Sequence, residues 1–191
     1  MGRAPVLRHP PELLLRGQDV RVAFFDIDGV LTDGGLYIAE LPGGDPRGAA
    51  ETVKRFHTLD GFGIKLLQAA GITPAVVTGR DAPALRARLQ ALGVTHARFG
   101  TEDKLPAAQA VLAELGLDWP QAAGIGDDWP DLPVLNRCAL ACAPANAHPE
   151  VRAAVHHVTE RPGGHGAARE FCDLLLAASG RYADLLARYQ A

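Results

Sequence analysis

The sequence predicts an α/β fold, namely a doubly wound, Rossmann-like parallel sheet with helices on both faces. Short apolar runs of the kind that form buried strands alternate along the chain with longer stretches of helical periodicity. The first run, residues 20–26, is apolar except for Arg21 and its terminal Asp26, as expected of a strand buried on both faces. A chain of 191 residues can bury the core of one such domain, and we expect a single domain across residues 1–191.

The remaining elements are expected in a regular order around this first strand. A short helix begins near residues 11–15, within an N-terminal extension of residues 1–18. Further strands are expected at residues 74–77, 94–99, 121–125, 140–143 and 155–158. Helices are expected at residues 60–70, 82–92, 104–115, 130–136, 165–178 and 181–189, the last within a C-terminal segment, 179–191. Glycines follow several of these helices, as is common at helix ends.

A β-hairpin is expected between the first strand and the next long helix. Residues 36–39 and 52–58 have strand-like patterns, and the intervening Leu41-Pro-Gly-Gly-Asp-Pro-Arg-Gly48 is rich in turn residues. We therefore expect a small flap, residues 36–58, that projects beside the end of the first strand. Such a flap suits two roles, covering a site or contributing to assembly.

Reactive residue types occur where the predicted strands end. Asp26 and Asp28 follow the first strand with Gly29 directly after them, and two like charges this close favour a compensating cation. The other members are Thr78 after the second strand, Lys104 at the start of a helix, and Asp127, Asp128 and Asp131 after the fourth strand. Because open α/β sheets bind ligands at the carboxyl ends of their strands, these groups are expected to converge.

The combined set suits phosphoryl transfer assisted by Mg²⁺. Carboxylates from two strand ends match a hard cation that takes oxygen ligands, while Thr78 and Lys104 suit phosphate oxygens. Asp26, at the end of the strand, is placed to attack phosphorus and form an aspartyl-phosphate. Asp28 is then placed to protonate the leaving oxygen and later to activate water. Taken singly, each residue also fits a structural role such as a cap or a turn.

Two rival classes of protein fit these residues less well. A phospho-acceptor receiver domain also uses acids, a Thr, a Lys and Mg²⁺, but it places its phosphorylated Asp after the third strand. Here the third strand ends in Phe99-Gly100 without an acid. A dinucleotide-binding domain needs Gly-x-Gly-x-x-Gly, whereas Gly124-Ile-Gly126 leads into acids.

Four segments together resemble the motifs of the haloacid dehalogenase superfamily. They are Asp26-Ile-Asp-Gly-Val-Leu-Thr-Asp-Gly34, Thr78-Gly-Arg80, Lys104 and Gly126-Asp-Asp-x-x-Asp131. More narrowly, Asp60-Gly-Phe-Gly-Ile64 and Gly163-Gly-His-Gly-Ala-Ala-Arg-Glu170 resemble the 3-deoxy-D-manno-octulosonate 8-phosphate (KDO 8-phosphate) phosphatases. This resemblance covers about residues 20–178, most of the chain.

The resemblance implies a role for each matching residue. Asp26 is the nucleophile, and Asp28 is the general acid and base. Mg²⁺ is held by Asp26, by the backbone carbonyl of Asp28 and by Asp127, with Asp131 in support. Thr78 and Lys104 bind phosphate. The substrate-binding residues expected on this basis are Asp60, Gly61, Gly79, Arg80 and Arg169.

The reaction implied by the resemblance is Mg²⁺-dependent hydrolysis of KDO 8-phosphate through an aspartyl-phosphate, a step toward lipopolysaccharide precursors. Two alternatives remain open: a phosphatase of another nonulosonate 9-phosphate, and a phosphatase-like assembly domain with little turnover. The family is typically tetrameric, so a homotetramer is expected. The chain departs from the family pattern in a longer hairpin loop, residues 41–50, and at Leu59, where a basic residue commonly precedes Asp60. Both departures bear on sugar specificity.

The spacing of the motifs leaves no room for a cap domain. The intervals hold only a hairpin with a helix, and then a helix with a strand. An open site of this kind is expected to be shielded by assembly or by residues 163–170. Within that segment His165 is a further candidate for substrate contact.

Composition narrows the setting in which the protein works. A net charge of −3 gives no sign of a nucleic-acid or membrane partner. No apolar run reaches the roughly 18 residues of a membrane span, and the N-terminus lacks a signal pattern, so a cytoplasmic protein is expected. Cys138, Cys142 and Cys172 form no disulfide framework and are expected to be reduced and largely buried.

Overall fold

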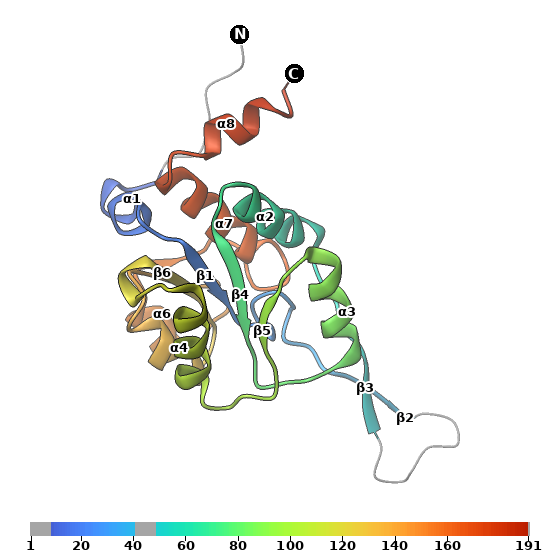
Figure 1. Cartoon of the computed structure of the whole chain (residues 1–191). Coiled ribbons are helices and arrows are strands. Elements are labelled where there is room, and N and C mark those ends of the chain that lie inside the picture. Colours follow the sequence, from blue (N-terminus) through green and yellow to red (C-terminus); the bar gives the residue numbers. More distant parts are fainter. Residues whose placement is uncertain (1–8, 41–48, 191) are drawn as a thin grey trace.

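A six-stranded parallel sheet forms the centre of the described chain (Figure 1). The computed structural model describes residues 9–40 and 49–190. The strand order is β5-β4-β1-β6-β7-β8, and every pairing within this sheet is parallel. The strands are β1 (Val22–Phe25), β4 (Thr73–Val77), β5 (His96–Arg98), β6 (Ala122–Ile125), β7 (Leu140–Ala143) and β8 (His157–Val158). The predicted doubly wound α/β fold is confirmed.

Strand β1 lies between β4 and β6, and its side chains contribute to the apolar cores on both faces of the sheet. All four of its residues are buried. Ala23 and Phe25 belong to one apolar cluster, and Val22 and Phe24 belong to the other, as the alternation of side chains along a strand requires. Burying Val22, Phe24 and Phe25 contributes about 1.5–3 kcal/mol for each side chain.

Helices cover both faces of the sheet (Figure 1). Those that contribute to the cluster containing Phe25 are α1 (Pro11–Gly17), α2 (Thr58–Ala69), α3 (Pro83–Leu92), α7 (Ala167–Ala178) and α8 (Tyr182–Ala187). The opposite cluster is completed by α4 (Lys104–Leu115) and α5 (Leu132–Leu135), and α6 (Pro149–Ala154) packs beyond α5. None of the helices in residues 9–40 and 49–190 is long and apolar enough to cross a membrane.

The hairpin is present, but its second strand lies earlier than predicted. Strands β2 (Tyr37–Glu40) and β3 (Ala49–Val53) pair antiparallel and project away from the sheet (Figure 1). Strand β3 ends at Val53 and α2 begins at Thr58. The prediction of a strand over residues 52–58 was therefore wrong beyond Val53. His57 caps that helix: its Nδ1 accepts a hydrogen bond from the backbone N–H of Leu59. The predicted tip, residues 41–48, lies outside the described residues.

Other boundaries differ by a few residues, and one helix was not predicted. Helix α6 follows His148, whose side chain caps it, and begins with a proline. The predicted helix over residues 130–136 is a short 3-10 turn (Trp129–Asp131) followed by α5. Between the predicted motifs, the described residues contain the hairpin and single helices, so no cap domain is present in that part of the chain. The three cysteines are free and buried, as expected.

Candidate active site

The loop after β1 turns sharply and places Asp26 at the edge of the sheet. The carbonyl of Ile27 accepts hydrogen bonds from the backbone N–H groups of Val30, Leu31 and Thr32 at 2.9–3.2 Å. Gly29 sits in this turn with φ of +88°, and a Cβ there would lie 2.1 Å from Asp127 Oδ2. The glycine therefore allows the turn and also the close approach of Asp127 from the neighbouring strand β6.

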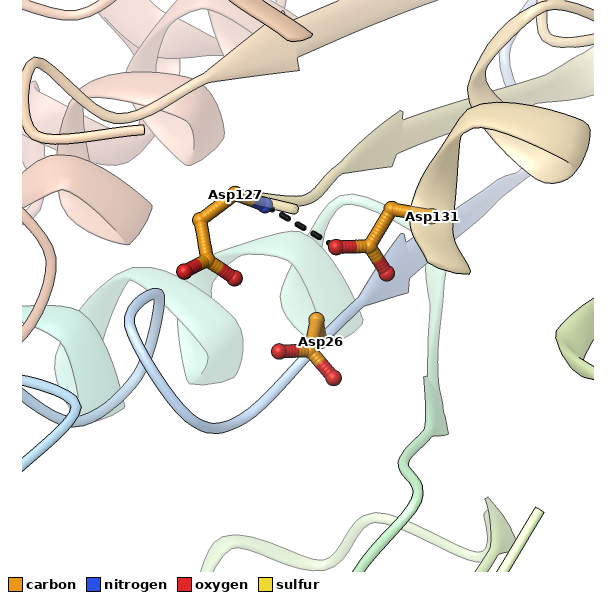
Figure 2. Close-up of side chains that lie close together, drawn as sticks. All are labelled: Asp26, Asp127 and Asp131. Atoms are coloured by element: carbon orange, nitrogen blue, oxygen red, sulfur yellow. Dashed lines mark hydrogen bonds between the residues drawn. The ribbon is translucent and has the colours of Figure 1, made fainter. Parts of the chain in front are cut away.

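Three carboxylates converge at this edge (Figure 2). Asp26, Asp127 and Asp131 each offer an oxygen, and these oxygens lie within 4.8 Å of one another. Asp131 Oδ2 accepts hydrogen bonds from the backbone N–H of Asp127 at 3.0 Å and from that of Asp128 at 3.2 Å. Asp131 thus fixes the loop that carries Asp127, as Figure 2 shows. The predicted convergence of acids from two strand ends is present in the structure.

Lys104 joins the cluster from the first turn of α4. Its Nζ lies 2.6 Å from Asp26 Oδ1 and 2.6 Å from Asp131 Oδ1, and all three side chains are 8% exposed. Burial acts to lower the pKa of Lys104, but attraction to the two carboxylates outweighs it, so the pKa is raised. The ammonium therefore stays charged and compensates part of the negative charge.

One lysine does not balance three acids, of which Asp26 and Asp131 are buried and Asp127 is partly buried. Burial, reinforced by the neighbouring charges of Asp26 and Asp131, raises the pKa of Asp127 to about 8. Burial and Asp131 likewise raise the pKa of Asp26 to about 6, against the opposing effect of Lys104. A second cation would stabilise the charged form of these carboxylates, which burial and the neighbouring negative charges disfavour. The all-oxygen donor set fits a hard ion such as Mg²⁺.

Asp28 lies apart from this trio and is held by two cations. Lys54 Nζ lies 2.5 Å from Asp28 Oδ1, and Arg80 Nε lies 3.3 Å from Asp28 Oδ2. The hydroxyl of Thr32 is 3.4 Å from Oδ1. Sequence reasoning did not find Lys54, since 26 positions separate it from Asp28 and nothing in their spacing indicates contact.

Thr78 and Gly79 form the turn at the end of β4. Thr78 is 1% exposed, and its Oγ1 accepts the backbone N–H of Arg80 at 3.3 Å. A Cβ on Gly79 would approach only Thr101 O, at 3.9 Å, so the backbone here is open. This turn brings Arg80 to Asp28, whereas the phosphate contact expected of Thr78 remains a prediction.

The contacts of Asp60, Gly61 and Arg169 are made within the helical layer. Asp60 is 1% exposed, and its Oδ1 accepts the backbone N–H of Arg169 at 2.8 Å, at the start of α7. A Cβ on Gly61 would lie 2.2 Å from a guanidinium nitrogen of Arg88. The Arg169 side chain donates to Asp173 at 2.8 Å. The contact of Asp60 joins α2 to α7, Gly61 allows α2 to approach Arg88 of α3, and the contact of Arg169 with Asp173 lies within α7. The substrate-binding role expected of the three residues remains a prediction.

The glycine-rich segment before α7 rests directly on the loop that carries Asp28. The backbone N–H of Gly164 donates to Val30 O at 2.9 Å. Arg55, just after the hairpin, donates to Gly164 O at 3.1 Å and lies 3.2 Å from His165 Nε2 and 3.4 Å from Asp33 Oδ2. Arg55 was also missed from sequence. His165 thus lies where the hairpin base meets this segment, and its substrate contact remains a prediction.

The fold and the arrangement of acids and lysine define a class of protein. A family model described as haloacid dehalogenase-like hydrolase matches residues 100–171, the part of the chain that holds Lys104, Asp127 and Asp131. The protein is a haloacid dehalogenase-like hydrolase.

Comparison with whole proteins narrows the class to one family. The chain is 39% identical over 170 residues to the 3-deoxy-D-manno-octulosonate 8-phosphate phosphatase KdsC of Yersinia pestis, covering 89% of this chain and 87% of that relative. It therefore belongs to the KDO 8-phosphate phosphatase family. A probable YrbI family phosphatase from Pseudomonas syringae pv. phaseolica superposes with a TM-score of 0.89 at 44% identity, over 95% of this chain and 99% of that one.

A second solved structure is similar over the same extent. It is the 3-deoxy-D-manno-octulosonate 8-phosphate phosphatase of Moraxella catarrhalis, in complex with magnesium ion, phosphate ion and KDO. The TM-score is 0.86 at 31% identity, over 95% of this chain and 99% of that one.

Proposed function

We propose that the protein is a Mg²⁺-dependent phosphatase that hydrolyses KDO 8-phosphate to KDO and phosphate. The observation that carries this proposal is the position of Asp26. Its carboxylate lies at a strand end between Lys104, at 2.6 Å, and the oxygens of Asp127 and Asp131. A nucleophile in such a setting suits a phosphate substrate, because Lys104 and a metal ion held by the carboxylates would together offset the negative charge of the phosphate. The family and the Moraxella relative's ligands support the choice of substrate.

The first half of the reaction transfers the phosphoryl group to the protein. An oxygen of Asp26 attacks phosphorus, and the bond between phosphorus and the sugar oxygen breaks. Asp28 gives a proton to that sugar oxygen, so KDO leaves as an alcohol. The product on the protein is an aspartyl-phosphate at Asp26.

The second half of the reaction restores the protein. Asp28, now a carboxylate, takes a proton from a water molecule whose oxygen attacks phosphorus. The bond between phosphorus and Asp26 breaks, inorganic phosphate leaves, and Asp28 again carries the proton that the next cycle needs.

Mg²⁺ would be held by Asp26, the backbone carbonyl of Asp28 and Asp127, with Asp131 in support. When bound, it offsets the negative charge shared by the carboxylates and the substrate phosphate. Thr78 and Lys104 bind phosphate oxygens in this proposal. A lysine ammonium has three donors, so Lys104 can hold both carboxylates and a phosphate oxygen at once. Arg80, whose side chain is 48% exposed, faces the substrate beside Gly79.

Assembly and location belong to the same proposal. We expect a cytoplasmic homotetramer in which the hairpin contacts neighbouring subunits. Three large apolar side chains next to or within the hairpin, Leu36, Tyr37 and Val53, are 46%, 47% and 55% exposed, and exposed apolar groups gathered on a projecting element favour a protein contact.

Phosphate release from a substrate panel tests the proposed function. The panel holds KDO 8-phosphate, N-acetylneuraminate 9-phosphate and an aryl phosphate, each with and without Mg²⁺. The proposal predicts Mg²⁺-dependent release that is strongest from KDO 8-phosphate. Preference for the nine-carbon substrate would replace the sugar assignment, and no release from folded, Mg²⁺-loaded protein would favour an assembly domain.

A further inference from the structure

Lys54 connects the hairpin to the reaction chemistry. It directly follows β3 and reaches Asp28 with an Nζ to Oδ1 distance of 2.5 Å, and its side chain is only 1% exposed. Two residues later, Phe56 pairs with Thr32 in an isolated antiparallel bridge. The segment that carries Lys54 is thereby fixed in register against the loop that carries Asp28.

The two oxygens of Asp28 are held unequally. Oδ1 contacts the buried Lys54, whereas Oδ2 contacts Arg80 Nε at 3.3 Å, and the Arg80 side chain is 48% exposed. An exposed ion pair is screened by water and rearranges easily, while a buried ammonium at short distance holds its partner firmly. Oδ1 is therefore anchored, and Oδ2 is the oxygen on the open side.

From this asymmetry we propose that Lys54 is a positioning residue for Asp28, one that fixes Oδ1 so that Oδ2 faces the leaving oxygen of the substrate. The inference rests on the proposed phosphatase function and adds a residue to it. The step is the one already described: the proton on Asp28 Oδ2 moves to the sugar oxygen while the bond between that oxygen and phosphorus breaks and the bond from Asp26 forms. Lys54 touches neither phosphorus nor the leaving group.

The test compares two leaving groups in a single turnover, so that only the first half-reaction is measured. A sugar alkoxide needs a proton to leave, whereas the p-nitrophenolate of an aryl phosphate leaves without one. Lys54→Met is expected to lower the single-turnover rate of KDO release about 10- to 100-fold, with KM changed less than about two-fold. Release of p-nitrophenolate should fall by much less. Lys54→Arg should restore part of the loss for the sugar substrate.

Controls separate positioning from other roles of Lys54. Lys65→Met removes an exposed lysine of α2 and should change neither rate. Thermal unfolding with Mg²⁺ checks that each variant is folded. If Lys54→Met does not fold, the two leaving groups are compared in Lys54→Arg and the wild type instead.

Three outcomes would overturn the inference: equal losses for both leaving groups, a raised KM with unchanged rate, or no change at all.

Failure of the proposed function would give a different result. A wild-type protein that acts on the aryl phosphate but not on KDO 8-phosphate would refute the sugar assignment alone. Glycerol phosphate, whose leaving group is also an alkoxide, would then replace the sugar substrate in the Lys54 comparison.

Discussion

The ammonium of Lys104 donates a hydrogen bond to the carboxylate of Asp26 over 2.6 Å, although 78 positions separate the two residues. The same ammonium holds Asp131, which in turn holds the backbone of Asp127. Lys104 is therefore the link between the loop after β1 and the loop after β6. Removing it leaves buried acids without their internal cation, which is costly.

Lys104→Met is predicted to lower the free energy of unfolding by about 3 kcal/mol in metal-free protein near neutral pH. The side chain is 8% exposed, so solvent screening reduces this cost little. Saturating Mg²⁺ should recover part of the loss, because a bound cation compensates the same carboxylates. Urea unfolding with and without Mg²⁺ measures both effects. Lys65→Met is the control, and a Lys104→Met protein as stable as this control would contradict the account.

Gly164→Ala and Gly116→Ala form a matched pair that tests the packing of the glycine-rich segment on the active-site loop. Both glycines have positive φ, +66° and +64°, so alanine is strained at either position by about 1–2 kcal/mol. Only at Gly164 would a Cβ also meet backbone, with Asp33 N at 2.4 Å and Thr32 C at 2.5 Å. Gly164→Ala should therefore destabilise by about 3 kcal/mol or more in total and also reduce activity.

Thermal unfolding and a phosphate-release assay compare the two variants. Equal losses of stability in Gly164→Ala and Gly116→Ala would show that the close backbone contact at Gly164 contributes nothing.

Mg²⁺ binding is predicted to strengthen as pH rises. In the metal-free folded protein the pKa of Asp127 is raised from 3.8 to about 8, so the folded state keeps a proton that the unfolded state has lost. The metal-free protein therefore loses stability as pH rises from about 4 to about 8. Mg²⁺ must displace that proton, so its apparent affinity should rise by up to about 10-fold per pH unit below about pH 8.

The increase in melting temperature on adding Mg²⁺ measures this linkage. The increase should be larger near pH 8 than near pH 6, and Asp127→Asn should abolish most of the difference. An increase that is the same at both pH values in the wild type would rule out a protonated Asp127 in the metal-free site.

Much of the fold and part of the site could be predicted from sequence because local signals determined them. The α4 helix and strand β7 were predicted with their observed bounds. Lys104 and the closing Gly116 mark the two ends of the helix, and a short apolar run marks the strand. The convergence of Asp26, Asp127 and Asp131 followed from the rule that parallel strands end on one edge. That rule requires only that the sheet is parallel.

Lys54 and Arg55 could not be predicted in this way. Their position depends on how the segment after β3 packs against the loop after β1. This packing is a tertiary contact between Phe56 and Thr32, and no local sequence pattern indicates it. The same limit applies to Asp60, whose contact with the start of α7 joins positions 109 apart. Periodicity places Asp60 near the start of a helix, but it does not show which other helix its side chain contacts.

The most direct test of the central claim is to trap the phosphorylated protein. KDO 8-phosphate and Mg²⁺ are mixed with the Asp28→Asn protein, the reaction is quenched with acid, and the peptides are analysed by mass spectrometry. This variant should form the aspartyl-phosphate slowly and hydrolyse it more slowly still. Phosphate is expected on the peptide at Asp26, and none is expected when Asp26→Asn is added to that variant. Phosphate on a different residue, or KDO release by wild-type protein with no phosphorylated intermediate at any quench time, would contradict it.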